Sequence, residues 1–243
     1  MMTGAVSGIL AALLLAWAAL LVGGWLIDTG GRTARNRLPL AARMATSAVL
    51  TVAALVWWRA GTADTALASY GLLIFVGMTL GFIGDLVMAK VIPTPNRVIF
   101  GMLTFGAGHL CYIAAFVGLR RDLGPASTAA FAAIWLAYAL VSALLWYTLI
   151  RQPVRGRALN VGTLVYALLL ATMAAAALAL AVQDVRLLPL ALGGLLFIAS
   201  DMFVGSELMR GTSFRSIGDV IWITYTVAQM LIVYSTAIVL QVA

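Results

Sequence analysis

Eight apolar runs, each long enough to cross a bilayer, follow one another along this chain and are separated only by short polar connections. A helix needs about 20 apolar residues to cross a membrane, whereas transmembrane β-strands show short segments of alternating polarity. No connection is long enough to fold alone, so residues 1–243 are predicted to form one all-α membrane domain. The predicted spans cover residues 5–27, 40–58, 67–89, 98–119, 126–150, 158–182, 187–209 and 217–241.

The composition excludes a soluble protein and argues against a nucleic-acid partner. Hydrophobic residues make up 64% of the chain and charged residues 9%, against about half and about a quarter in soluble domains. The net charge is +7, but the arginines lie in short clusters between apolar runs, where they set topology and contact lipid phosphates. A nucleic-acid interface needs a folded polar surface, and the sequence offers none.

The basic residues are unequally divided between alternate connections. Because Lys and Arg accumulate in cytoplasmic connections, the richer set is expected on the cytoplasmic side. Both termini are then expected on the opposite side of a plasma (inner) membrane. The richer set is Arg32, Arg35, Arg37, Arg43, Lys90, Arg97, Arg151, Arg155, Arg157, Arg210 and Arg215, and the other set is Arg59, Arg120, Arg121 and Arg186.

The two halves of the chain also resemble each other weakly. Asp85 and Asp201 are 116 residues apart, and each is followed 24 residues later by a polar residue in the next span, His109 and Tyr225. Four spans separate the equivalent positions, so two four-helix repeats would be parallel. Coincidence in a chain rich in Ala, Leu and Gly is the alternative.

Asp85 and Asp201 are carboxylates that lie inside the third and the seventh span. A charge near the bilayer centre costs about 2.5–3.5 kcal/mol on insertion scales, and such residues face the bundle interior and mark functional sites by default. The alternative is a helix-end cap or a satisfied interhelical hydrogen bond. Residues four apart share the face of each aspartate and favour close helix contact. These are Gly77 and Gly81 on the third span and Gly194, Phe197 and Gly205 on the seventh.

His109, Tyr225 and Gln229 are further polar residues inside spans. His109 is the single histidine and titrates near neutral pH, and the Gln229 amide needs a partner in hydrocarbon. Counting 1.5 Å per residue from the expected cytoplasmic ends places these residues and both aspartates on one side of the midplane. A structural histidine and an interfacial tyrosine are the alternatives. One histidine and no cysteine cluster do not make a zinc site, so neither metal nor cofactor is expected.

The connection between the third and fourth spans contains two prolines, Pro93 and Pro95, which prevent a continuous helix. Lys90 and Arg97 flank these prolines and are candidates to hold a lipid phosphate. Positive-inside anchoring is the alternative for both residues. Glu207, where the seventh span meets the cytoplasm, is expected to be solvated or salt-bridged.

Several of these residues together resemble the YhhN-like lysoplasmalogenase family of eight-span membrane proteins. The resemblance covers the chain from the third span to the end, and Thr224 departs from it because a second aromatic residue is expected before Tyr225. It implies hydrolysis of the vinyl-ether bond of a lysoplasmalogen, a lysophospholipid, to a fatty aldehyde and a glycerophospho-headgroup. The motifs are Gly84-Asp85, His109 with Tyr112, Ser200-Asp201, and Tyr225 with Gln229.

The polar residues fit this chemistry independently of the resemblance. A vinyl ether is opened by protonating its β-carbon, and water captures the resulting oxocarbenium-like cation; this needs an acid, a base and nearby negative charge. Asp85 and Asp201 are predicted to supply acid and base in an order that the sequence leaves open, while His109 tunes or shuttles the proton. No Ser nucleophile elbow is present, which argues against an ordinary esterase. The candidate substrate-binding residues are Tyr112, Ser200, Tyr225, Gln229, Lys90 and Arg97.

Two other functions remain open at this point. A proton-coupled transporter also uses intramembrane carboxylates and repeated halves, and it predicts flux across sealed vesicles without chemical change. A non-catalytic membrane scaffold predicts that both aspartates tolerate substitution by Asn. Headgroup preference and oligomeric state are also left open by the sequence.

Overall fold

The computed structural model describes residues 4–27, 35–124 and 127–243, and these residues contain helices and no strand. Four short helical segments connect or extend the long helices: the π-helical turns η1 (Trp57–Thr62) and η2 (Trp146–Ile150), and the 3-10 turns η3 (Pro153–Arg155) and η4 (Val185–Leu187). The long helices are α1 (Gly4–Leu26), α2 (Leu40–Val56), α3 (Ala68–Met88), α4 (Arg97–Asp122), α5 (Thr128–Leu145), α6 (Arg157–Gln183), α7 (Leu188–Arg210) and α8 (Ile217–Tyr234), followed by the short α9 (Thr236–Val242).

Eight of these helices are long and apolar enough to cross a membrane, which confirms the predicted number of spans. The predicted ends agree within a few residues, and the largest difference is at the second span. There η1 continues α2 to Thr62, past Arg59. The guanidinium of Arg59 lies 5.2 Å from the ring centroid of Trp58, so the charge is held against an aromatic ring at the span's end.

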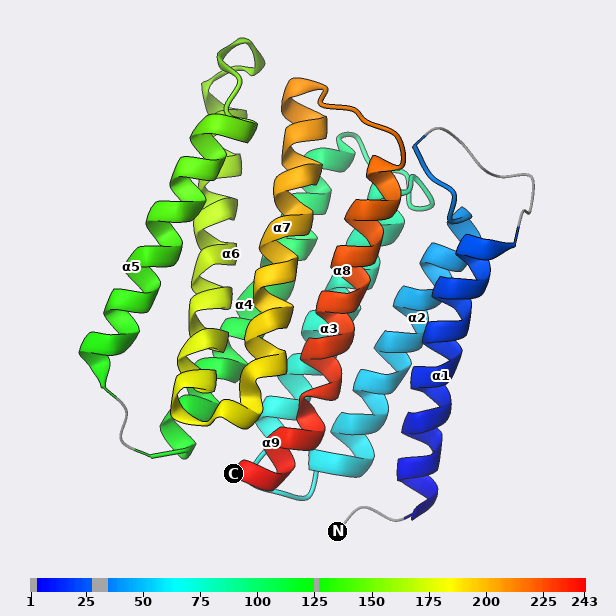
Figure 1. Cartoon of the computed structure of the whole chain (residues 1–243), viewed down its shortest axis with the longest axis vertical. Helices are drawn as coiled ribbons and strands as arrows, with labels where there is room; N and C mark the ends of the chain where they lie inside the picture. The colour runs from blue at the N-terminus through cyan, green and yellow to red at the C-terminus, as the bar shows by residue number, and fades with distance from the viewer. Residues whose placement is uncertain (1–3, 28–34, 125–126) are drawn as a thin grey trace.

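The spans form one bundle in which α1 and α5 lie at opposite edges (Figure 1). α1 packs on α2 and α5 on α6, while α2 contacts α8 and α4 contacts α6 in the interior. Indole N–H groups fasten both edges: Trp17 donates to Thr226 at 2.8 Å, and Trp135 donates to Thr172 at 2.9 Å. The two parallel repeats stay a prediction.

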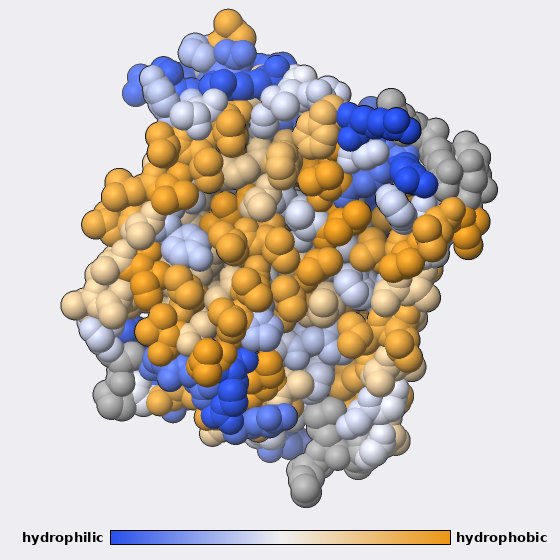
Figure 2. All heavy atoms as spheres, in the orientation of Figure 1, coloured by the Kyte–Doolittle hydropathy of each residue, from blue (hydrophilic) through white to orange (hydrophobic). Residues whose placement is uncertain are grey.

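A hydrophobic belt crosses the face of the bundle drawn in Figure 2, and hydrophilic residues gather at its two ends. Large aliphatic side chains point outward along this belt, for example Leu15, Leu103 and Leu140, each more than 60% exposed. Such a surface matches lipid and not water, so the chain is an integral, multi-pass membrane protein. The side of the membrane on which the termini lie stays a prediction, and Arg32 lies outside the described residues.

Glycines bring the interior helices into close contact. A methyl group added at Gly77 of α3 would lie 2.5 Å from the ring of Tyr112 and 3.1 Å from the carbonyl oxygen of Gly108 on α4. One added at Gly194 of α7 would lie 2.9 Å from Cα of Ala174 on α6. The predicted close approach on the faces of both aspartates is therefore confirmed, and it places the polar residues of neighbouring helices within bonding distance.

Polar contacts at one end of the bundle join the α1–α2 connection to α7 and α8. Arg35 donates two hydrogen bonds to the Glu207 carboxylate at 2.5 and 2.7 Å, so the expected salt-bridged end of α7 is present. The hydrogen bond to Glu207 is the largest cause that raises the pKa of Arg35. Asp219 accepts from the backbone N–H groups of Arg37 and Leu38 at 2.7 and 3.0 Å. These contacts fix where the chain enters α2.

Candidate functional site

Asp85 lies in the interior of the bundle, and its side chain is held by two hydroxyl groups. The residue is only 4% exposed. Ser47 of α2 donates to Oδ2 of Asp85 at 2.5 Å, and Tyr225 of α8 donates to the same oxygen at 3.0 Å. Helices α2, α3 and α8 thus meet at one carboxyl group.

The hydrogen bonds continue from Tyr225 to the amide of Gln229 and then to α4. Nε2 of Gln229 donates to the Tyr225 hydroxyl at 3.3 Å, and the Tyr112 hydroxyl donates to Oε1 of Gln229 at 2.8 Å. A methyl group at Gly81 would lie 2.8 Å from Nε2 of Gln229, so the glycine leaves room for the amide. Ser47, Asp85, Tyr225, Gln229 and Tyr112 are called the Asp85 network.

A second chain of hydrogen bonds connects α7, α6 and α4. The Tyr166 hydroxyl donates to Oδ2 of Asp201 at 2.6 Å, and the same hydroxyl oxygen lies 3.2 Å from Nε2 of His109. His109 is 1% exposed, whereas Asp201 is partly exposed. Asp201, Tyr166 and His109 are called the Asp201 network.

The two networks meet at the ring of Phe197 on α7. Its centroid lies 4.6 Å from the centroid of the His109 ring and 5.4 Å from that of Tyr225, in edge-to-face geometry with both. The structure therefore brings the five polar residues singled out inside the spans into one region, with Phe197 and Tyr225 as its aromatic centre.

Three residues predicted to bind substrate lie outside both networks. The Ser200 hydroxyl donates to the carbonyl oxygen of Ile221 at 3.0 Å and so fastens α7 to α8. Arg97 donates to the carbonyl oxygen of Met88, the last residue of α3, at 3.1 Å. Lys90 is exposed and has a φ of 62°, in the turn that follows α3. The predicted phosphate contact of Lys90 and Arg97 stays a prediction.

Ser47 and Tyr166 belong to the networks but were not singled out from the sequence. Tyr166 had a signal, because Asn160, Thr163 and Tyr166 recur every three residues on the sixth span and indicate a polar side of that helix. Ser47 had none. A serine in a membrane helix can satisfy its hydroxyl on its own backbone, so its presence does not indicate a partner.

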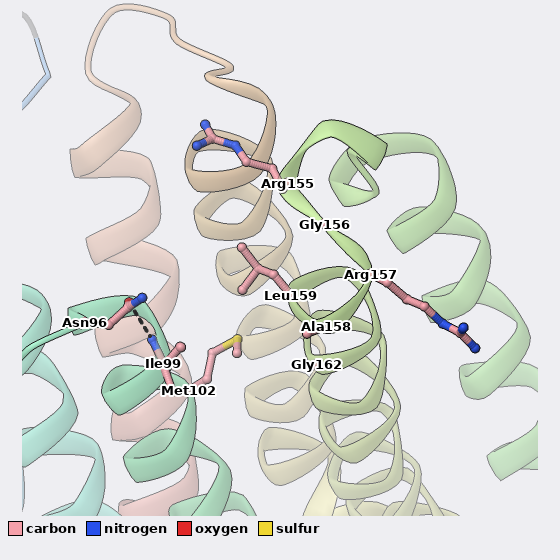
Figure 3. A pocket seen from close by; sticks show the side chains of 9 residues that line it. All are labelled: Asn96, Ile99, Met102, Arg155, Gly156, Arg157, Ala158, Leu159 and Gly162. Atoms are coloured by element: carbon pink, nitrogen blue, oxygen red, sulfur yellow. Dashed lines mark hydrogen bonds between the residues drawn. The ribbon is translucent and has the colours of Figure 1, made fainter.

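A cavity of about 500 Å³ opens between the first turns of α4 and α6. Ile99, Met102 and Leu159 point into it, whereas the side chain of Arg157 points away (Figure 3). Tyr166 follows Gly162 by one helical turn, so the α6 wall of the cavity leads toward the Asp201 network. The lining residues are Asn96, Ile99, Met102, Arg155, Gly156, Arg157, Ala158, Leu159 and Gly162.

The described residues contain no group of three or more His, Cys, Asp and Glu side chains that could hold a metal ion. The two networks together contain two carboxyls, one imidazole, one amide and four hydroxyls. Cys111 on α4 is a free, half-buried thiol. Acid–base chemistry is what this set of groups can perform.

A sequence model of the YhhN family matches residues 38–236. The chain belongs to the YhhN family. The matched region contains every residue of both networks, while α1 precedes it. No curated protein and no solved structure matches the chain. Membership of the YhhN family supports a lysoplasmalogenase-like, hydrolytic role at the level of the family.

Thr224, where the resemblance predicts an aromatic residue, forms hydrogen bonds within its own helix. The Thr224 hydroxyl donates to the backbone carbonyl oxygens of Val220 and Ile221, at 2.8 and 3.0 Å. The hydrogen-bonding capacity of the Thr224 hydroxyl is thus met within α8. Around Tyr225 the aromatic surface comes instead from Trp222 and Phe105, whose ring centroids lie 5.3 and 5.9 Å from its own.

Proposed function

We propose that this YhhN-family protein is a membrane-embedded hydrolase that cleaves the vinyl-ether bond of lysoplasmalogens. The observation that carries the proposal is the meeting of two intramembrane carboxyls, Asp85 and Asp201, around one aromatic centre. Each carboxyl accepts a short hydrogen bond from a hydroxyl group of another helix. Intramembrane carboxyls are retained where they act, and family membership supports hydrolysis as that action.

The reaction requires a proton and a water molecule at neighbouring carbons. Protonation of the β-carbon of R–CH=CH–O–R′ gives the cation R–CH₂–CH=O⁺–R′. Addition of water to its charged carbon releases a proton and gives the hemiacetal R–CH₂–CH(OH)–O–R′. Collapse of the hemiacetal yields the aldehyde R–CH₂–CHO and the alcohol HO–R′, which carries the glycerophospho-headgroup.

The residues of both networks fit these steps. Asp85 and Asp201 belong to the acid side and the base side of the reaction, and His109 moves a proton. Tyr225, Gln229 and Tyr112 hold the Asp85 carboxyl in place and line the reaction centre. The faces and edges of the surrounding aromatic rings suit a cationic intermediate better than aliphatic side chains would.

The cavity between α4 and α6 supports access of an amphipathic molecule. Its walls at Ile99, Met102 and Leu159 are apolar, and the polar residues Asn96 and Arg155 also line it. Such a combination suits a single-chain lipid, which has one apolar tail and one polar headgroup. A lysolipid entering here would approach Tyr166 and Asp201 along α6.

The test is mass spectrometry of products after the purified protein is incubated with a lysolipid panel. The panel contains a lysoplasmalogen, the matched alkyl-ether lysolipid and the matched ester lysolipid. We expect free fatty aldehyde from the lysoplasmalogen alone, because only its vinyl ether gives a stabilised cation on protonation. Release of fatty acid from the ester, with no aldehyde, would contradict the proposal.

A proton-coupled transporter is the second candidate. It is favoured by the hydrogen-bonded polar groups buried across α2, α3, α8 and α4, because such chains conduct protons in membrane proteins. In sealed vesicles a transporter would carry an unchanged solute in response to a pH gradient. A hydrolase would give aldehyde in detergent, where no gradient exists.

A further inference from the structure

The Tyr166 hydroxyl lies between a carboxylate and an imidazole, and it has one hydrogen to donate. That hydrogen goes to Oδ2 of Asp201 at 2.6 Å. The contact of 3.2 Å between the Tyr166 oxygen and Nε2 of His109 must therefore be donated by the imidazole, because two lone pairs cannot bond to each other. Nε2 of His109 carries the hydrogen.

A neutral imidazole carries one N–H, so Nδ1 of His109 is left with a lone pair. Nδ1 is fully buried, and within the described part of the chain it has no hydrogen-bond partner. Buried polar atoms are nearly always paired, with protein or with an ordered small molecule. An unpaired acceptor at this depth points to a small hydrogen-bond donor as its partner.

Among the described residues, the aromatic rings around His109 offer no hydrogen to Nδ1. Phe197 presents an aromatic ring 4.6 Å from the imidazole centroid. The Tyr112 ring is 6.5 Å away, and its hydroxyl hydrogen is already donated to Gln229. The Tyr166 hydroxyl hydrogen is donated to Asp201. Buried water molecules typically pair with polar groups that have no partner within the protein, and water is the smallest such donor.

We propose that Nδ1 of His109 binds the water consumed in hydrolysis and that Tyr166 is the positioning residue that keeps this nitrogen unprotonated. The inference rests on the proposed vinyl-ether hydrolysis and deepens it. It divides the two networks by role: the Asp201 network is the base side, and the acid of the reaction is Asp85. The same tyrosine couples the imidazole to the Asp201 carboxylate, as a buried carboxylate orients the histidine of a hydrolytic triad.

The proton balance of the reaction closes with these assignments. Asp85 gives its proton to the β-carbon of the vinyl ether. The water oxygen forms a bond to the charged carbon and passes one proton to Nδ1 of His109, which becomes imidazolium. When the hemiacetal collapses, its hydroxyl proton returns to Asp85, and the imidazolium proton goes to the departing alkoxide oxygen. Both residues end as they began.

The single histidine allows a direct test. Protein labelled with ¹⁵N-histidine and reconstituted in bilayers gives two ring-nitrogen signals from one residue, and nitrogen NMR distinguishes a protonated from a bare ring nitrogen. We expect hydrogen on Nε2 and none on Nδ1. In Tyr166→Phe the hydroxyl oxygen that accepts the Nε2 hydrogen is lost, so both tautomers of His109 should be populated. Tyr147→Phe is the matched control, because Tyr147 is 58% exposed and belongs to neither network, and it should keep the wild-type spectrum.

Kinetics of aldehyde release tests the role in hydrolysis. In Tyr166→Phe we expect kcat to fall about 100-fold, typical of losing an oriented base, with KM changed less than about threefold. Hydrogen on Nδ1 in the wild type would overturn the assignment, even if Tyr166→Phe failed to fold. Unchanged kcat in a folded Tyr166→Phe would overturn the water-binding role. If no substrate gave aldehyde, the vinyl-ether function would fall, while the tautomer result would still decide what Tyr166 does.

Discussion

The Asp85 network and the Asp201 network differ in how completely their hydrogen bonds are satisfied. The Asp85 carboxyl is 4% exposed and accepts from two hydroxyls, and the chain continues through the Gln229 amide to Tyr112. The Asp201 carboxyl is partly exposed and accepts from one hydroxyl. The chain from Asp201 ends at Nδ1 of His109, which is unpaired among the described residues.

This difference indicates different tasks for two carboxyls that look alike in the sequence. A buried network of several linked hydrogen bonds holds its members in one geometry, which suits a group that must deliver a proton to one carbon atom. A network with an open end has a place for a ligand. The two networks share Phe197, so a substrate between them would meet the fixed carboxyl on one side and the open acceptor on the other.

The largest expected effect is that of Asp85→Asn. The amide keeps the shape of the side chain but cannot supply a proton, so aldehyde release should fall about 10³- to 10⁴-fold, the upper range for a general acid. Asp64→Asn is the control, because Asp64 is exposed and lies in the connection before α3. Product is measured by mass spectrometry, and folding is checked by the elution profile in detergent. Turnover within about tenfold of wild type would remove Asp85 from the chemistry.

Asp201→Asn should have a smaller effect, about 100-fold, because Asp201 acts on the reacting water only through Tyr166 and His109. The loss should appear in kcat more than in KM. It should also resemble the loss in Tyr166→Phe, and the double variant should lose little more than either single one, because the residues act as one unit. Additive losses in the double variant would show that Asp201 and Tyr166 act independently. The Asp201 network would then not be one functional unit.

The helices and their polar contents were predictable, whereas the neighbours of each helix were not. Apolar runs of about 20 residues define spans, and the rise of 1.5 Å per residue gives each polar side chain a depth. Agreement in depth predicted that Asp85, Asp201, His109, Tyr225 and Gln229 would meet. Depth does not say which helices touch, so the contacts of α2 with α8 and of α4 with α6 had no signal in the sequence.

The residues that the sequence missed or misplaced follow from this limit. Ser47 and Tyr166 become network members only because α2 faces α3 and α6 faces α7. Ser200 lies next to Asp201 in the sequence and therefore looked like a site residue. On a helix, adjacent side chains point about 100° apart, and Ser200 faces the backbone of α8 instead.

Gly81→Ala tests the packing of the Asp85 network without removing any of its polar groups. The added methyl group would lie 2.8 Å from Nε2 of Gln229 and 3.2 Å from the Tyr225 hydroxyl. Both groups must therefore shift, which weakens the hydrogen bond from Tyr225 to Asp85. We expect aldehyde release to fall about tenfold, as small misplacements of catalytic groups do. Gly118→Ala on α4 is the matched control, since no atom lies within 4 Å of its added methyl group. Equal activity in the two variants would mean that the Asp85 network tolerates displacement.

The smallest expected effect comes from a matched pair of serines, one inside the Asp85 network and one outside both networks. Ser47 and Ser200 are each 1% exposed, and each donates one hydrogen bond, to Asp85 and to the Ile221 carbonyl respectively. Both alanine variants should lose about 1 kcal/mol of stability, the usual net value of such a bond. Only Ser47→Ala should lower aldehyde release, by about three- to tenfold, because Asp85 keeps the Tyr225 bond and loses the shorter one. The reverse result, with Ser200→Ala the slower enzyme, would restore Ser200 to the substrate site and move the reaction centre toward α7 and α8.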